Sequence, residues 1–387
     1  MDLSYILNHL GEDRAAYFNA VAPPVVQSSN FAFSDLEDMR NKFSDELSNH
    51  VYSRGNNPTV EILRKKIAAL EHAEDCLVFS SGAAAIAMAV IANVKSGDHI
   101  VCVKSPYSWT ANLLKKFLSR FNISHTFVDG KHISEIEKAI QENTTVLLLE
   151  SPNTLFFELQ DLRACAILAK EKGITTIIDN SHCSPIFQNP LEFGIDIVVH
   201  SGTKYINGHS DVVVGLLCSS REMVQKIFQS EFMTLGAILS PHDANLVIRG
   251  LRTLELRVKK SDSSAAKIAE WLYQQKQVEK IFFPFHPSFE QYELAKSQMS
   301  GCGGLITVQF KTDSMIKMEN FVHALEHFLI AVSWGGHESL MMPTIGFYNI
   351  KGRDSNLPIP WNTVRFYIGL EDPDWLIKDL ENAMKLL

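Results

Sequence analysis

Lys204 is the residue of this sequence with the clearest chemical potential. It stands in the stretch Ser201-Gly202-Thr203-Lys204, directly after the apolar run 196–200. A lysine so close to a buried strand is costly unless its amine is used, because burial disfavours the charged form. The same burial would lower the pKa of the amine, so that Lys204 could act as a nucleophile or a base near neutral pH.

Polar side chains follow other apolar runs of the sequence in the same way. They are Ser80, Ser81 and Gly82 at the end of run 76–81, Tyr107 after 99–103, Glu150 to Asn153 after 145–150, and Asp179 and Asn180 after 175–179. In an open parallel sheet, ligands bind outside the carboxyl ends of the strands. We therefore expect these groups to gather with Lys204 along one edge of a sheet.

The chemistry that this set permits includes phosphate binding. Gly82 and Ala83 open a predicted helix, whose free N–H groups and dipole favour an anion, and Ser201 and Thr203 are short hydroxyl donors. The sequence contains neither G-x-G-x-x-G nor G-x-x-x-x-G-K-[ST], so a dinucleotide or a nucleoside triphosphate is not the obvious source of the phosphate.

A phosphate site combined with an acid and an amine suits pyridoxal 5'-phosphate (PLP). Lys204 would form the Schiff base, Asp179 would keep the ring nitrogen protonated, and Tyr107 would stack on the ring. Taken singly, each residue has a structural explanation, such as a turn-forming aspartate or a solvated loop lysine. Together, at the ends of successive strands, they favour a site.

A second motif is set aside. His323, Glu326 and His327 match the zinc pattern H-x-x-E-H, on a helix expected near 315–329. The apolar residues of this segment leave both histidines and the glutamate on the opposite face. We therefore expect a solvated helix surface and no metal site.

The elements that position these residues are predicted from the hydrophobic pattern. From about residue 59 to 220, short apolar runs alternate with helical periodicity at 60–73, 83–94, 109–120 and 161–172. Continuous apolarity marks strands buried on both faces, and strand–helix alternation indicates a mostly parallel sheet. This is the pattern of an α/β domain.

The rest of the chain is expected to form two further parts. Residues 242–277 read as one long helix or two joined ones, followed by the apolar runs 303–310 and 364–370 and a closing helix from Asp374. We predict an N-terminal arm (1–50), a large cofactor-binding domain (51–240) and a smaller α+β domain (241–387).

Composition limits the partners. The 387 residues carry a net charge of −8 without a Lys/Arg cluster, so nucleic acid and anionic membranes are poor candidates. No segment reads as a secretory signal or approaches the length of a membrane span. The six cysteines are scattered without a C-x-x-C pair, which fits free thiols in a reducing cytoplasm.

At these residues the sequence resembles the Cys/Met-metabolism family of PLP enzymes, which have the aspartate-aminotransferase type of fold (fold type I). The matching segments are YSRGNNPT (52–59), SSGAAAI (80–86), IIDNSH (177–182), HSGTKYINGHSDVVVG (200–215), IRGLRTLELR (248–257), SWGGHESL (333–340) and VRFYIGLEDPDWLIKDL (364–380). Together these segments span nearly the whole chain.

The resemblance implies a role for each matching residue. Lys204 carries the cofactor, Asp179 pairs with its ring nitrogen and Tyr107 stacks on the ring. The residues that hold the phosphate are Gly82, Ala83, Ser201 and Thr203, with Tyr52 and Arg54 reaching it from a neighbouring subunit. The active unit would then be at least a dimer, and we expect a homotetramer. Arg365 would bind the substrate α-carboxylate, and Ser333 and Trp334 lie in the substrate loop.

Within the family, the resemblance leans toward the cystathionine β-lyase branch, through segments such as ESPNTLFFELQD (150–161). It implies cleavage of L-cystathionine to homocysteine, pyruvate and ammonia in methionine biosynthesis, with Lys204 and Tyr107 moving protons. We also predict Asn153 and Val332 as substrate-binding residues, although Asn153 stands one place before the usual asparagine near the cofactor oxygen. Val332 precedes Ser333, where the β-lyase has Tyr, cystathionine γ-synthase and γ-lyase have Glu, and methionine γ-lyase has an apolar residue.

Other functions therefore stay open. Methionine γ-lyase and cystathionine γ-synthase or γ-lyase are the alternatives among enzymes. A regulator that binds the cofactor without turnover is the alternative from another class, although such a protein would not need Lys204, Tyr107 and Arg365 together.

Overall fold

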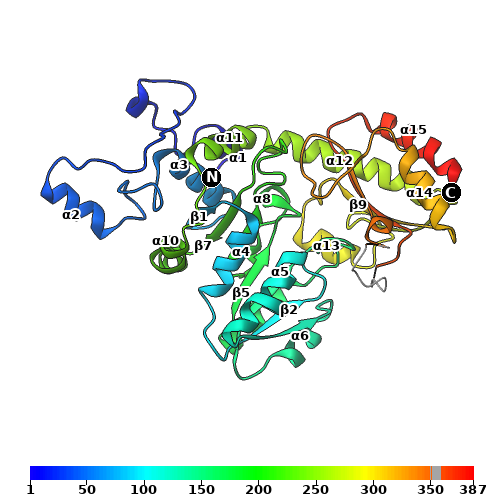
Figure 1. Cartoon of the computed structure of the whole chain (residues 1–387), viewed down its shortest axis with the longest axis horizontal. Helices are drawn as coiled ribbons and strands as arrows, with labels where there is room; N and C mark the ends of the chain where they lie inside the picture. The colour runs from blue at the N-terminus through cyan, green and yellow to red at the C-terminus, as the bar shows by residue number, and fades with distance from the viewer. Residues whose placement is uncertain (349, 351–358) are drawn as a thin grey trace.

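The computed structural model describes residues 1–348, 350 and 359–387. Within these residues the chain forms two separate sheets, with the long helix α12 (Leu254–Tyr273) running from one to the other. Figure 1 shows the larger sheet with its helices in the middle of the molecule and the smaller sheet toward the C-terminus, in orange and red. The predicted α/β architecture with a mostly parallel sheet is confirmed.

The large sheet has the strand order β1-β7-β6-β5-β4-β2-β3 among the described residues. Its strands are β1 (Asp75–Phe79), β2 (His99–Val103), β3 (Ser124–Val128), β4 (Thr144–Glu150), β5 (Thr175–Asp179), β6 (Ile197–Ser201) and β7 (Gly215–Ser219). The pairs from β3 through β6 are parallel, whereas β7 is antiparallel to both β6 and β1. Helices on both faces bury these strands, which explains their nearly continuous apolar sequences.

Helices cover the large sheet on both faces. They are α3 (Pro58–Leu70), α4 (Gly82–Ile91), α5 (Ser108–Asn112), α6 (Ile133–Ala139), α7 (Leu162–Lys172), α8 (Ser184–Phe187), α9 (Arg221–Ile227), α10 (Met233–Leu235) and α11 (Pro241–Leu251). Local sequence sets where they begin: Ser81 caps α4 by accepting the N–H of Ala84, and Asn57 caps α3 just before a proline. The caps fix the first turn of α4 beside the carboxyl end of β6.

The smaller sheet has the order β10-β11-β12-β9-β8. Its strands are β8 (Val278–Phe282), β9 (Leu305–Phe310), β10 (Leu329–Ile330), β11 (Leu340–Pro343) and β12 (Thr363–Tyr367), and its helices are α13 (Tyr292–Gln298), α14 (Met315–Ala324) and α15 (Pro373–Ala383). Phe310 packs against Phe321 of α14, with ring centroids 4.7 Å apart, so this sheet and its helices share a core. The central strand β12 carries Arg365.

The N-terminal residues extend away from the large sheet, where Figure 1 shows the blue helix α2 (Leu36–Ser44) at the edge of the molecule. The first helix, α1 (Leu3–Asn8), is tied down by the buried amine of Lys66, which donates to the carbonyls of Ile6 and Leu7 and pairs with Glu12 at 3.1 Å. Phe18 is fully exposed, so part of this segment presents apolar surface.

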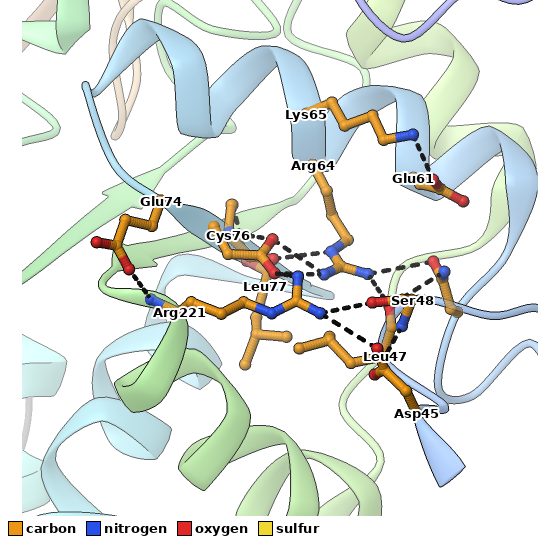
Figure 2. Close-up of polar contacts among 12 residues, drawn as sticks. Asp45, Leu47, Ser48, Glu61, Arg64, Lys65, Glu74, Cys76, Leu77 and Arg221 are labelled. Atoms are coloured by element: carbon orange, nitrogen blue, oxygen red, sulfur yellow. Dashed lines mark hydrogen bonds and ion pairs between the residues drawn. The ribbon is translucent and has the colours of Figure 1, made fainter. Parts of the chain in front are cut away.

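A buried ion network joins this segment to the large sheet. Arg64 of α3 forms a fork with both oxygens of Asp75 at 3.0 and 3.1 Å and donates to the carbonyl of Leu47. Arg221 approaches the same carboxylate from α9 at 2.6 Å. Figure 2 shows the guanidinium groups of Arg64 and Arg221 close to each other in this network. The network therefore fixes the stretch that leads to Tyr52 and Arg54.

Some predicted elements differ from the structure. The helix expected near 315–329 ends at Ala324, because β10 takes up Leu329 and Ile330. Residues 242–277 form two joined helices, α11 and α12, as one of the two predicted alternatives. Strands β3 and β8 and helices α6 and α13 were not expected from the pattern. β3 lies at the edge of its sheet and is only partly buried, which weakens its apolar signal.

No helix in the described part of the chain is long and apolar enough to cross a membrane. Among the same residues, no group of three or more His, Cys, Asp or Glu side chains is arranged to hold a metal ion. The imidazole of His327 instead stacks on Trp375, with ring centroids 3.6 Å apart.

Candidate active site

Lys204 lies in the turn that follows β6, at the carboxyl edge of the large sheet. Its amine donates a hydrogen bond to the Ser333 hydroxyl at 2.6 Å and lies 5.6 Å from the centre of the Trp334 ring. Burial and the nearby Arg365 charge lower the pKa of Lys204 to about 8, although the Asp179 carboxylate opposes this shift. The amine is therefore far more available as a nucleophile or base than that of a solvated lysine.

The loop that carries Ser333 and Trp334 packs directly on the Lys204 backbone. Ser333 has a φ of 78°, which is rare for a residue with a side chain. Gly335 has a φ of 90°, and a Cβ placed there would lie 2.8 Å from the carbonyl carbon of Lys204. Only glycine meets both conditions, so Gly335 allows this loop of the smaller domain to reach the lysine.

The predicted phosphate-binding residues lie together at the start of α4. A Cβ on Gly82 would lie 2.8 Å from the Cβ of Ser201, so the first turn of α4 and the end of β6 are in van der Waals contact. The N–H groups of Gly82 and Ala83 have no partner inside the helix. The Thr203 hydroxyl accepts the backbone N–H of Val214 at 2.9 Å.

Asp179 ends β5 and Tyr107 follows β2, so both belong to the carboxyl edge of the large sheet. Asp179 accepts hydrogen bonds from the N–H and the hydroxyl of Ser181 at 2.9 and 2.5 Å, which orient its carboxylate. Tyr107 is 44% exposed, as a ring that receives a flat cofactor needs to be. Burial and the charges of Asp179 and Glu150 raise the pKa of the Tyr107 hydroxyl.

Arg365 lies at the bottom of the site, only 6% exposed. Its guanidinium donates to the Thr154 carbonyl at 3.0 Å and to the Ser333 carbonyl at 3.4 Å. Burial lowers the pKa of Arg365 to about 10, with the nearby Glu150 acting in the opposite direction. A buried guanidinium next to the lysine is suited to an anionic group such as an α-carboxylate.

Asn153, which the sequence suggested as a substrate ligand, is turned toward its own loop. Its amide nitrogen donates to the Glu158 carboxylate at 3.0 Å, and its amide oxygen accepts the Glu158 N–H at 3.2 Å. Its neighbour Thr154 is the residue whose backbone contacts Arg365. Asn153 thus shapes the turn that supports the guanidinium.

The remaining predicted residues differ in how deeply they are buried. Trp334 is nearly buried and packs edge-on against Tyr205, with ring centroids 5.2 Å apart. Val332 is 74% exposed, so its side chain faces outward in the single chain. Tyr52 and Arg54 are exposed beside each other, with the guanidinium 5.5 Å from the ring centre. This exposure is compatible with the predicted contact to a neighbouring subunit.

Two residues of the site had no assigned role in the sequence analysis. His182 is buried between Phe157 and Trp334, with ring centroids 5.0 and 6.1 Å away, and burial together with the Arg365 charge lowers its pKa to about 3. Glu150 accepts the backbone N–H of Tyr107 at 2.7 Å. Glu150 was expected at this sheet edge as a polar residue that ends an apolar run, whereas His182 falls only within the matching segment 177–182.

These residues fit PLP. The open first turn of α4 against Ser201 suits the phosphate, the oriented Asp179 carboxylate suits a ring nitrogen, and the Lys204 amine suits an aldehyde. The fold and the site together therefore define a PLP-dependent enzyme with a mostly parallel α/β sheet.

Comparisons with known proteins give the family. The family model described as "Cys/Met metabolism PLP-dependent enzyme" matches residues 5–385. An L-methionine gamma-lyase from Pseudomonas deceptionensis is 38% identical over 385 residues, covering 98% of this chain and 96% of the relative. The cystathionine gamma-lyase of Homo sapiens is 36% identical over 382 residues, covering 97% and 92%.

A solved structure agrees with these relatives. The crystal structure of metB from Corynebacterium glutamicum matches with a TM-score of 0.92 and 32% identity, covering all of this chain and 98% of the other. The chain belongs to the Cys/Met metabolism family of PLP-dependent enzymes. The predicted family, fold and cofactor are confirmed, and the two relatives described above are named as γ-lyases.

Proposed function

We propose that this protein is a carbon–sulfur lyase that performs γ-elimination on a small sulfur-containing L-amino acid, with L-methionine as the first candidate. The observation that carries the proposal is the position of Ser333. Its hydroxyl accepts from the Lys204 amine and its carbonyl accepts from the Arg365 guanidinium, so one residue holds the reactive amine beside the buried cation. A bound amino acid would place its carboxylate on Arg365 and its Cα near Lys204.

The residues have distinct tasks in this reaction. Arg365 binds and orients the carboxylate, and its buried surroundings exclude water from that end of the substrate. Bound PLP supplies the electron sink that makes the Cα proton acidic. Lys204 removes that proton, and γ-elimination requires a second removal at Cβ, for which the same amine is within the site. Tyr107 accepts a proton from the incoming substrate amine.

The preference for γ-elimination rests on the relatives and on Val332. The relatives compared above act, by their names, as methionine or cystathionine γ-lyases. Val332 supplies no acidic group next to Ser333, where a carboxylate would recognise the distal amine of cystathionine. An apolar residue there suits the uncharged thioether end of methionine.

The β-elimination of L-cystathionine, toward which the sequence resemblance leaned, is the second candidate. The resemblance of segment 150–161 to that branch favours it. A cofactor-binding regulator without turnover is the candidate from another class. A lowered lysine pKa beside a buried arginine argues for turnover, because simple cofactor binding does not require the arginine.

Product identification tests the proposal. The PLP-loaded protein is incubated with L-methionine, L-homocysteine and L-cystathionine, with Lys204→Ala as the inactive control. γ-Elimination gives 2-oxobutyrate, whereas β-elimination of cystathionine gives pyruvate. We expect 2-oxobutyrate from L-methionine. Pyruvate from cystathionine alone would establish the second candidate, and no thiol or keto acid from any substrate would support the regulator.

We also propose that the enzyme is a cytoplasmic homotetramer in which Tyr52 and Arg54 complete the site of a neighbouring subunit. Both side chains are exposed in the single chain. Co-expression of Lys204→Ala with Arg54→Ala provides a test, because mixed dimers would contain one site with neither change. Recovered activity is expected. Its absence, in mixed dimers verified by mass, would contradict shared sites.

A further inference from the structure

Glu150 and Asp179 form a pair of carboxyl groups at the edge of the large sheet. Glu150 ends β4, Asp179 ends β5, and the two are direct register partners in a parallel pair. Register partners on neighbouring strands point to the same face, so the carboxyl groups lie side by side. Glu150 is only 7% exposed. The charged form of a buried carboxyl group is disfavoured both by its removal from water and by a carboxylate beside it.

The surroundings decide which carboxyl keeps the proton. Asp179 accepts two hydrogen bonds from Ser181, one from its N–H and one from its hydroxyl, whereas Glu150 accepts from a backbone N–H. Burial and the Asp179 charge raise the pKa of Glu150 to about 8, against the opposing effects of the Tyr107 and Thr154 backbones and of Arg365. The thiol of Cys102 is the other titratable neighbour, and its pKa is raised by burial. Glu150 is therefore the neutral member of the pair.

The structure also shows what Glu150 holds. Its carboxyl accepts the backbone N–H of Tyr107 at 2.7 Å, and Tyr107 is the residue directly before α5. Resting on the proposed function, we propose that Glu150 is a positioning residue that works as a neutral acid. It fixes the backbone of the ring-stacking Tyr107 and leaves Asp179 as the charged partner of the cofactor nitrogen.

Two substitutions separate this role from a requirement for charge. Glu150→Gln keeps an oxygen that can accept the Tyr107 N–H and is permanently neutral, so PLP affinity should stay within about twofold of the wild type. Glu150→Ala leaves that N–H without its acceptor, and we expect the dissociation constant for PLP to rise about tenfold. The induced circular dichroism of the bound cofactor, which reports how the ring is held, should weaken only in Glu150→Ala.

Glu74 provides a matched control. Its carboxylate accepts the backbone N–H of Arg221 at 2.7 Å, at the start of α9, as Figure 2 shows. Glu74→Ala should leave PLP affinity and the circular dichroism of the cofactor unchanged. A Glu150→Ala protein that only melts earlier, with cofactor binding intact, would reduce Glu150 to a structural role and overturn the proposal.

The remaining outcomes are also decisive. If Glu150→Gln impairs PLP binding as much as Glu150→Ala, the ionised form is needed and the neutral-acid role is wrong. The proposed lyase function has a separate test. It is wrong if the PLP-loaded wild type releases no keto acid, and this result does not depend on how the Glu150 variants bind PLP.

Discussion

The Lys204 amine and the Ser333 hydroxyl are joined by a hydrogen bond of 2.6 Å, although 129 positions separate them in the chain. The bond connects the turn after β6 of the large sheet with the loop that precedes β11 of the smaller sheet. Because Ser333 also accepts from Arg365, the Lys204 amine and the Arg365 guanidinium depend on the same loop. The packing of this loop against the large sheet therefore shapes the candidate site.

Gly335→Ala should separate this loop from Lys204. The new Cβ would lie 2.8 Å from the backbone of Lys204 and Tyr205, so either the loop or the lysine must move. We expect the dissociation constant for PLP to rise at least about tenfold, since a displacement that costs about 1.4 kcal/mol has that effect. Absorbance titration of the apo-protein with PLP measures the change.

Gly97→Ala is the control for backbone strain. Gly97 has a φ of 92°, close to the 90° of Gly335, but a Cβ there would meet no atom within 4 Å. Both variants should lose about 1–2 kcal/mol of stability from the left-handed backbone. Only Gly335→Ala should lose cofactor affinity, and equal affinity in the two variants would show that the contact with Lys204 is unimportant.

Much of the fold follows from the sequence because burial leaves a strong local pattern. Strands β2 and β5 match the apolar runs at 99–103 and 175–179, since both are covered by helices on both faces. β3 has no such pattern, because an edge strand needs fewer apolar residues. The predicted helix 315–329 is longer than α14 in the structure. The reason is that Leu329 continues the apolar periodicity of the helix but pairs with Leu340 in a sheet.

The site was predictable where residues follow buried strands, and unpredictable where distant segments meet. Lys204 and Asp179 stand at strand ends, so the topology of a parallel sheet brings them to one edge. The packing of Gly335 on Lys204 and the burial of His182 beside Trp334 depend on how the smaller domain docks. The hydrophobic periodicity of a single segment does not show which distant segment it will contact.

Arg365→Lys should damage substrate binding much more than cofactor binding. The guanidinium reaches the carbonyls of Thr154 and Ser333 with separate nitrogens, and an ammonium group on a shorter, unforked chain cannot reproduce that geometry. We expect KM to rise about 10- to 100-fold, corresponding to the loss of one or two charge-assisted hydrogen bonds. Steady-state kinetics measure this effect, and the spectrum of bound PLP should be unchanged. An unaltered KM would exclude Arg365 as the carboxylate ligand.

His182 should make the protein sensitive to acid. Burial and the Arg365 charge lower its pKa in the folded state from 6.5 to about 3, so the unfolded chain takes up the proton first as the pH falls. The stability contributed by the neutral histidine is thus complete above pH 6.5 and is lost progressively between pH 6.5 and about 3. The loss approaches about 1.4 kcal/mol for each pH unit within this window.

His182→Phe tests this dependence, because a phenyl ring can keep the packing against Phe157 and Trp334 without titrating. The urea concentration at the unfolding midpoint of the wild type should decrease as the pH is lowered from 7.5 to 5. This decrease should be clearly smaller in His182→Phe. His323→Phe, on the exposed side of α14, should behave as the wild type. The same acid dependence in all three proteins would mean that His182 contributes little to it.

Asp75→Ala should destabilise the large domain and loosen the segment that carries Tyr52 and Arg54. Removal of this carboxylate leaves the buried guanidinium of Arg64 without its anionic partner, and breaking a buried pair in this way costs about 3–5 kcal/mol. Arg64 also donates to the Leu47 carbonyl and the Asn56 side chain, so a displaced Arg64 would release the residues between them. Thermal unfolding and limited proteolysis measure the two effects.

Asp45→Ala is the matched control, since Asp45 also faces Arg221 but at 3.7 Å and with a side chain that is 44% exposed. Solvent screens such a pair, so its loss should cost less than about 1 kcal/mol. Figure 2 shows Asp45 near the Arg221 guanidinium. If Asp75→Ala melts within a degree or two of Asp45→Ala, and new cleavage does not appear between residues 47 and 56, the buried pair does not hold this segment. We expect burial, and not the number of ion pairs, to decide the difference in stability between the two variants, because an unpaired charge costs more free energy where water cannot reach it.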